Sequence, residues 1–421
     1  MKLLIQKARI TDPNSSFNGK VCDLLIVNGV IEQIKETIPA EAGIPVFTSP
    51  NLSISPGWFD LQANFREPGL EYKEDLKSGA AAAAAGGYTA VALMPATTPP
   101  THSKSEIEYI IHRSKGAAVD IFPIGTVSHK LEGKELSEMY DMHLSGAVAF
   151  SDDKQPLKNA GLLVRALLYT KNFNRLIFTH CEETSLSAEG KMNEGITSTE
   201  LGLKGMPALA EEVMVARNIQ LAEYAETPIH FCSVSTAGSV QLIREAKAKG
   251  LQVSCSVNAH HLGLTDTALA GFDSNLKVNP PLRSQSDIEA LKKGLKDNTI
   301  DVIVSDHLPE DVENKVLEFD HAAFGMIGLE TAYALANTFS GLTPEALVDK
   351  LAIAPRKLLG MPVPVIKEGV AANLTLFDPK KDWTFQATDI RSKSKNTPFV
   401  GHAFKGKALA TFLNGKLNKI D

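Results

Sequence analysis

Through the middle of the chain, short apolar runs alternate with longer stretches of helical periodicity, and this alternation restricts the fold more than any other feature. It is typical of parallel β-strands joined by helices, and about 300 residues of it suit one (β/α)8 barrel. We therefore predict an α/β protein with a barrel over residues 55–362. The expected strands are 89–94, 119–124, 146–150, 175–179, 228–232, 252–257 and 301–305. The expected helices are 73–85, 104–115, 207–225, 236–248 and 286–296.

Both ends of the chain carry a different pattern, in which short apolar runs are separated by turn residues. Asn28-Gly29 lies between two such runs near the start, and Asn414-Gly415 follows another near the end. Asn-Gly between apolar runs indicates a β-hairpin. We predict that residues 1–54 and 363–421 pair into one small β-sandwich domain.

Composition excludes several classes of protein. The formal net charge is −6, with both signs interspersed, so the basic face that nucleic acid requires is absent from the sequence. No apolar run approaches the roughly 20 residues that span a bilayer, and Lys7 and Arg9 interrupt the N-terminal apolar segment. The four cysteines are widely spaced. That spacing suits a reduced cytoplasm, where we expect the protein, and Cys181 and Cys232 are expected to be inert packing.

Polar residues stand where the expected strands end. In a (β/α)8 barrel the chemistry lies at the carboxyl ends of the strands. Taken singly, such residues would merely end strands and start helices; taken together, they favour a shared binding or catalytic site. No nucleophile elbow, His-Glu-x-x-His motif or phosphate-binding glycine loop competes with this interpretation. The residues are Asp60, Gln62 and Asn64, then Ser151-Asp152-Asp153, His180, Ser233 and Asp306-His307.

Residues 56–69 read Pro-Gly-Trp-Phe-Asp-Leu-Gln-Ala-Asn-Phe-Arg-Glu-Pro-Gly. This segment resembles the opening barrel strand of the dihydroorotases of the amidohydrolase superfamily, in which the pattern is Asp-x-His-x-His. The resemblance covers nearly the whole chain and implies an amidohydrolase-type barrel. Further similar segments are 94–100, 146–153, 191–195, 203–207, 279–283, 328–331 and 392–399.

The resemblance implies a binuclear zinc centre, and the sequence departs from it. Three of the four ligand histidines are replaced, and Val148 stands where related amidohydrolases place a carboxylated lysine. A catalytic zinc normally has three protein ligands, so we expect no cofactor here, and zinc only if the protein is active. The family's ligand positions are Gln62, Asn64, Asp153 with Asp152 as its rival, His180, Ser233 and Asp306.

The family's substrate-binding residues are also only partly present. Arg66 and Asn279 remain, whereas Ala96 and Glu310 stand where the family has an asparagine and a histidine. A carboxylate at Glu310 would repel an anionic substrate. In the family, Asp306 would move the proton as general base, so in this chain it is interpreted as a vestige of that role.

Three hypotheses follow from the resemblance. The leading one is a dihydroorotase-like protein of pyrimidine biosynthesis that is impaired or inactive and serves as a structural or regulatory partner of aspartate transcarbamoylase. The second is an active dihydroorotase with an altered or single-metal site. The third is a non-catalytic metabolite sensor that uses Arg66 and Asn279. A homo-oligomer is expected in each case.

Overall fold

Eight parallel strands form a closed barrel in the computed structural model, which describes residues 2–420. They belong to two hydrogen-bonded sheets, β6–β7–β8 and β9–β10–β13–β14–β15. Two single bridges, Gly125 with Phe150 and Ala63 with His307, join the edges of these sheets and close the ring. The strands are β6 (Trp58–Ala63), β7 (Tyr88–Leu93), β8 (Asp120–Pro123), β9 (Phe150–Ser151), β10 (Ile177–His180), β13 (Ile229–Cys232), β14 (Val253–Asn258) and β15 (Val302–Val304).

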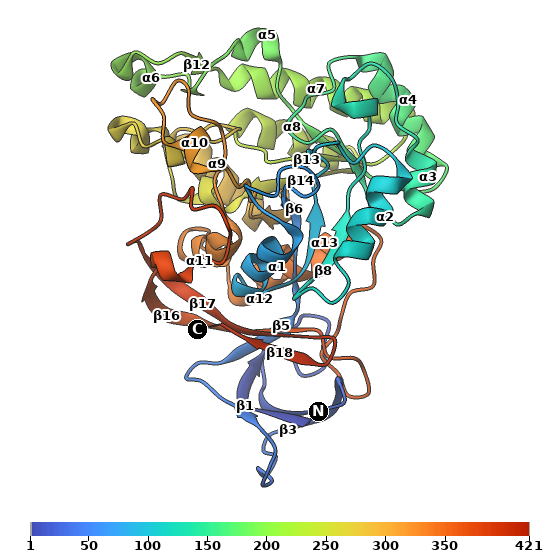
Figure 1. Ribbon diagram of the computed structural model, residues 1–421, viewed down its shortest axis with the longest axis vertical. Coiled ribbons are helices and arrows are strands. Elements are labelled where there is room, and N and C mark those ends of the chain that lie inside the picture. The colour runs from blue at the N-terminus through green and yellow to red at the C-terminus, as the bar shows by residue number, and fades with distance from the viewer. Residues whose placement is uncertain (1, 421) are drawn as a thin grey trace.

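Helices surround this barrel, and the β-domain lies below it in Figure 1. The longer helices are α1 (Leu76–Ala85), α2 (Lys104–Arg113), α4 (Ala160–Lys171), α7 (Ala208–Ala225), α8 (Ala237–Ala248), α9 (Gln285–Lys296) and α11 (Leu329–Phe339). Shorter elements are α3 (Met139–Leu144), α5 (Thr184–Ser187), β11 (Met192–Asn193), α6 (Ile196–Leu201), β12 (Gly205–Met206), α10 (Val312–Lys315), α12 (Pro344–Val348) and α13 (Ala354–Leu358).

The two ends of the chain form one antiparallel unit. β5 pairs with β16, which links N-terminal strands to C-terminal ones in the order β18–β17–β16–β5–β1–β2–β3. Side chains from both ends, among them Ile5, Ile54, Leu374 and Phe412, share one buried apolar cluster. The strands are β1 (Lys2–Ile10), β2 (Val21–Val27), β3 (Val30–Lys35), β4 (Val46–Phe47), β5 (Ser53–Pro56), β16 (Leu374–Thr384), β17 (Ala403–Leu413) and β18 (Lys416–Lys419).

Both Asn-Gly pairs form the hairpin turns that the sequence indicates. Asn28 and Gly29 have φ values of 49° and 82°, and Asn414 and Gly415 have 50° and 76°. Two consecutive left-handed residues define the turn whose twist matches that of the paired strands, and Asn-Gly adopts it at low cost. The architecture is thus the predicted (β/α)8 barrel with a small β-sandwich domain.

Two local predictions need correction. The strand expected over 146–150 is reduced to β9, although the Val148 N–H still donates to the Pro123 carbonyl at 3.1 Å. Asp60 and Gln62 lie within β6 and not after it.

The predicted domain boundary after residue 54 falls inside β5, and the boundary after residue 362 falls in the segment between α13 and β16; both stay predictions.

Candidate functional site

The mouth of the barrel, at the carboxyl ends of its strands, brings together the six residues at the family's ligand positions. All are buried, the most exposed being Asp306 at 6%. Three of them have positive φ angles, so the chain leaves three strands through strained left-handed residues, which often cluster at functional sites. The six are Gln62 in β6, Asn64 after it, Asp153 after β9, His180 ending β10, Ser233 after β13 and Asp306 after β15.

Packing of Phe65 on α1 fixes the segment that carries Asn64 and Arg66. A Cβ added at Gly79 would lie 2.5 Å from the Phe65 ring, so only glycine lets the ring lie so close to the helix. The Asn64 backbone N–H also donates to the His307 carbonyl at 2.9 Å. These contacts place the side chains of Asn64 and Arg66 at the mouth.

Asp306 lies at the centre of a hydrogen-bond network. Its Oδ1 accepts from Gln62 Nε2 at 2.9 Å and from Lys154 Nζ at 2.7 Å. Its Oδ2 accepts from Asn258 Nδ2 at 2.9 Å, and Gln62 Nε2 donates in addition to Ser233 Oγ at 2.7 Å. Both carboxylate oxygens are therefore occupied by donors from this chain.

His180 belongs to a second network, which Glu182 organises. Glu182 Oε2 lies 3.3 Å from His180 Nε2 and accepts from Asn279 Nδ2 at 2.9 Å, and its Oε1 accepts from Ser187 Oγ at 2.5 Å. Burial alone would raise the pKa of Glu182, but the hydrogen bonds from His180, Ser187 and Asn279 lower it to about 2. The retained histidine and the retained asparagine are thus bound to an internal carboxylate.

Asp152 and Asp153 have different environments. Asp152 accepts from the backbone N–H groups of Val127 and Ser128, both at 2.9 Å, and from the Ser128 hydroxyl, so it holds the loop after β8. Burial raises the pKa of Asp152 to about 6. Asp153 is buried too, and its Oδ1 has no hydrogen-bond partner among residues 2–420. Burial raises the pKa of Asp153, and the charges of Lys154 and Arg66 oppose that rise.

Arg66, which the resemblance predicts to bind a substrate carboxylate, contacts an internal carboxylate. Its Nη2 lies 2.5 Å from Glu310 Oε1, and its Nε donates to the Pro309 carbonyl at 3.1 Å. Lys73 Nζ lies 2.5 Å from the other Glu310 oxygen. Half-buried Ala96 offers only a methyl group at the asparagine position. Glu310 is therefore paired with the positive charge of Arg66 that an anionic substrate would need for binding.

The residues at the mouth do not fit a zinc centre. Amide and hydroxyl groups are weak zinc donors, and Gln62 directs its NH₂ group toward Ser233 and Asp306. Among residues 2–420, no group of three or more His, Cys, Asp or Glu side chains is arranged to hold a metal ion. Asn64 Oδ1, Asp153 Oδ1 and His180 Nδ1 are buried without a hydrogen-bond partner in that range, which makes the mouth polar and incompletely paired.

Lys154 and Glu182 are among the residues of these networks that sequence reasoning missed. Each lies one or two residues beyond a predicted strand-end residue: Lys154 follows Asp153, and Glu182 follows His180 by two. A charged residue so close to a strand end was the available signal.

Asp60 has a structural role, because its carboxylate accepts from the backbone and hydroxyl of Ser305 and so ties β6 to β15. Burial raises the pKa of Asp60 to about 6.

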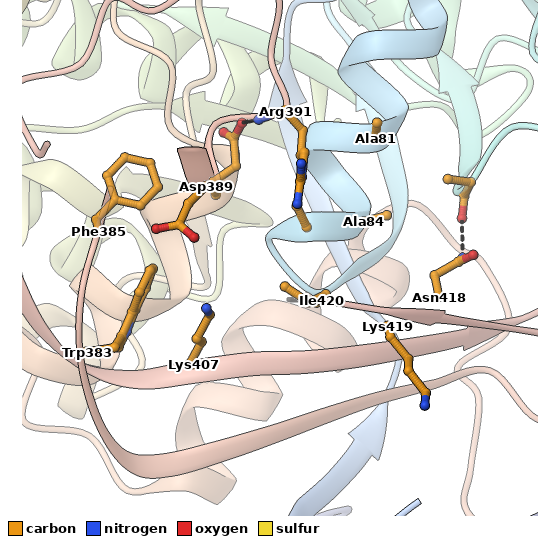
Figure 2. A pocket seen from close by; sticks show the side chains of 13 residues that line it. Ala81, Ala84, Trp383, Phe385, Asp389, Arg391, Lys407, Asn418, Lys419 and Ile420 are labelled. Atoms are coloured by element: carbon orange, nitrogen blue, oxygen red, sulfur yellow. Dashed lines mark hydrogen bonds between the residues drawn. The ribbon is translucent and has the colours of Figure 1, made fainter. Parts of the chain in front are cut away.

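Other chemistry has no support at the mouth. Cys181 and Cys232 are buried free thiols, and burial raises the pKa of Cys181 to about 12, which suppresses the reactive thiolate. A pocket of about 210 Å³ lies elsewhere, between α1 and strands β16–β18 (Figure 2), and none of the six mouth residues lines it. No helix within residues 2–420 has the length and apolarity to cross a membrane.

Solved structures share the fold of this protein. The L-hydantoinase (dihydropyrimidinase) from Arthrobacter aurescens superposes with a TM-score of 0.86 at 23% identity, covering 99% of this chain and 95% of that one. A D-hydantoinase (dihydropyrimidinase) from Thermus sp. gives 0.83 at 21% identity, covering 99% and 94%. The fold is that of the amidohydrolases.

Sequence relatives narrow the class to one family. A family model described as Dihydro-orotase-like matches residues 52–239. The dihydroorotase of Geobacter metallireducens is 44% identical over 421 residues, which cover 99% of each chain. That of Acetivibrio thermocellus is 42% identical over 420 residues, covering 99% of this chain and 98% of the relative. The chain belongs to the dihydroorotase family.

Proposed function

We propose that this chain is a dihydroorotase-family protein of pyrimidine biosynthesis that does not interconvert dihydroorotate and carbamoyl aspartate. The observation that carries the proposal is the state of Asp306. In the family's role this carboxylate moves a proton, which requires a lone pair directed at the reacting group. Here Gln62, Lys154 and Asn258 donate to its two oxygens. Gln62, Asn64 and Ser233 stand in place of the histidines that would hold the metal that activates a water molecule.

The binding side of the mouth supports the proposal independently. Arg66 and Lys73 both contact Glu310, whose side chain is only 7% exposed. A substrate carboxylate would have to displace the carboxylate of Glu310, which belongs to the same chain and need not bind from solution. Binding of dihydroorotate through Arg66 is therefore expected to be weak.

Turnover measurement tests this proposal. The protein is purified from a host that lacks its own dihydroorotase, supplemented with zinc, and assayed in both directions beside its Asp306→Asn variant. We expect no turnover above background in either protein. Turnover that is present in the wild type and absent in Asp306→Asn would refute the proposal; equal traces in both would identify a contaminant.

The names of the relatives favour a second candidate, an active dihydroorotase. Its metal would have to be held by Asp153, His180 and Asp306, the vestigial ligand set. In that case chelation should abolish turnover and zinc should restore it. A rate that is insensitive to both treatments would contradict a single-metal enzyme.

We further propose that the non-catalytic role is to be a structural or regulatory partner of aspartate transcarbamoylase. Apolar side chains are exposed on two short helices and just after one of them: Ile196 at the start of α6, and Val312 and Val316 on and after α10, the last 76% exposed. Where such side chains form one contiguous patch, they mark a surface that binds a partner. Co-purification with aspartate transcarbamoylase that Val316→Asp weakens would support the role. No co-purification would remove it.

The sensor hypothesis has less physical support. Asn279 donates to Glu182 and Arg66 contacts Glu310, so both proposed ligand-binding groups have internal partners. Calorimetric titration with dihydroorotate and with orotate tests this hypothesis. We expect no heat of binding and no thermal shift, whereas clear saturation with either compound would restore it.

A further inference from the structure

We propose that the ammonium group of Lys154 is the resident cation of the barrel mouth, that is, the positive charge that occupies the place of a metal ion. It balances the carboxylates of Asp153 and Asp306 and keeps a divalent metal out. The inference deepens the proposed function and rests on it for the identity of the ligand positions. It assigns a task to a residue that no motif of the chain singles out.

The position of Lys154 is the first support. Lys154 follows Asp153 directly in the loop after β9. Its Nζ donates to Asp306 Oδ1 at 2.7 Å and to the Asn279 carbonyl at 2.9 Å. Only 18% of its side chain is exposed. Two hydrogen bonds and this burial hold the ammonium group against the carboxylate of Asp306.

The charge balance of the mouth is the second support. Buried carboxylates need a nearby positive charge, and Asp153 and Asp306 share this mouth. Lys154 contacts the carboxylate of Asp306 directly and is the residue next to Asp153 in the chain. Arg66, another cation of the mouth, is shared with Glu310.

The neighbouring histidines cannot supply that charge. Burial lowers the pKa of His261 to about 4 and holds the pKa of His260 well below its ordinary value, so both are neutral at neutral pH. Lys154 therefore supplies positive charge that these two histidines do not.

An ammonium at this place competes with a metal for the same oxygen. Zinc binds a carboxylate oxygen at about 2.0–2.2 Å and would lie beside the Lys154 ammonium, which repels it. Restoring the three ligand histidines leaves this cation in place. The variant Gln62→His/Asn64→His/Ser233→His should consequently bind zinc poorly until Lys154 is changed too.

Calorimetric titration of zinc into three proteins tests the inference: the triple-histidine variant alone, with Lys154→Ala, and with Lys154→Arg. We expect Lys154→Ala to tighten zinc binding at least about tenfold, because it removes the competing charge, and Lys154→Arg, which keeps that charge, to give no gain. Equal zinc affinity in the triple variant and in its Lys154→Ala derivative would overturn the inference. Turnover is not measured, so the result does not depend on whether the wild type is active.

Single variants provide a second readout that needs no histidine. Lys247 is the matched control: its Nζ lies 2.7 Å from Asp301, before β15, just as Lys154 lies 2.7 Å from Asp306, after β15. We expect Lys154→Ala to lower Tm by about 5 °C, more than Lys247→Ala, because it leaves the buried carboxylate of Asp306 without its cation. Equal losses in the two variants would contradict a resident cation.

Discussion

The two ends of the barrel are both buried, but they are filled by different kinds of contact. At the end that faces the β-domain, the Trp58 ring lies 4.4 Å from that of Tyr333 and 5.4 Å from that of Phe377, measured between centroids. Arg356 donates from Nη1 to the Gly57 carbonyl at 2.6 Å there. At the mouth, amide, carboxylate and ammonium groups bind one another, and several buried polar atoms lack partners within residues 2–420.

This difference separates what holds the fold from what would carry chemistry. The apolar end depends on side-chain shape and volume, so its residues cannot change without loss of packing. The polar end depends on pairing, and pairing can be rebuilt with other residues. In our interpretation Gln62 and Glu310 are such replacements, and the barrel around them is intact. The family fold therefore persists, and we propose that the family site does not.

The largest effect is expected from Trp58→Ala, at the apolar end. Trp58 is fully buried, and its loss leaves a cavity and removes three aromatic contacts. We expect the free energy of unfolding to fall by about 3–5 kcal/mol, measured by urea denaturation. A loss no larger than that of an exposed aromatic control, Tyr224→Ala, would erase the proposed difference between the two ends.

Glu310→Gln should have the second largest effect. The change keeps the shape of the side chain but leaves Arg66 and Lys73 without their shared carboxylate. Because this ion pair is buried, we expect a loss of about 3 kcal/mol together with a gain in affinity for small carboxylates at the freed Arg66. Denaturation and calorimetry measure the two effects. Glu132→Gln, which breaks the exposed pair with Lys134, serves as the control and should change neither.

A smaller effect concerns pH and Glu182. Its pKa is lowered to about 2 in the folded protein by hydrogen bonds that overcome burial, whereas an unfolded glutamate has a pKa of about 4.3. This group therefore adds stability that is present above about pH 4.3 and is lost as the pH falls towards about 2. In Glu182→Gln the free energy of unfolding should vary less across that window. A slope equal to that of the exposed control Glu200→Gln would contradict the assignment.

The smallest effect is expected from Asn64→Leu. Asn64 buries an amide oxygen that has no partner among residues 2–420, so an apolar side chain of similar size removes a penalty. We expect the free energy of unfolding to stay the same or to rise by about 1 kcal/mol. A large loss, measured by thermal and urea denaturation, would mean that Asn64 makes a contact essential to the mouth.

The fold was predictable because it depends on local patterns. Buried parallel strands such as 89–94 are continuous apolar runs, and the Asn-Gly pairs mark the hairpins of the β-domain. The strand predicted over 146–150 was too long, because an apolar run does not show how many of its residues pair with a neighbouring strand.

The mouth was less predictable because its networks join residues far apart in the sequence. Strand-end position suggested Asp306 and His180, but not the side chains that bind them. The Glu310–Arg66 pair joins residues 244 positions apart, and the different roles of Asp152 and Asp153 depend on the left-handed turn at Asp153. Contacts of this kind become visible only in three dimensions.

The metal content of the purified protein tests the central claim most directly, namely that the mouth is a self-paired polar cluster and not a metal centre. The full chain is expressed in zinc-supplemented medium, dialysed without chelator, and analysed by mass spectrometry for zinc per chain. We expect less than about 0.1 zinc per chain, because three of the four ligand histidines are replaced and the ammonium group of Lys154 lies at the mouth. One or two equivalents of zinc, lost in the His180→Ala variant, would contradict the account.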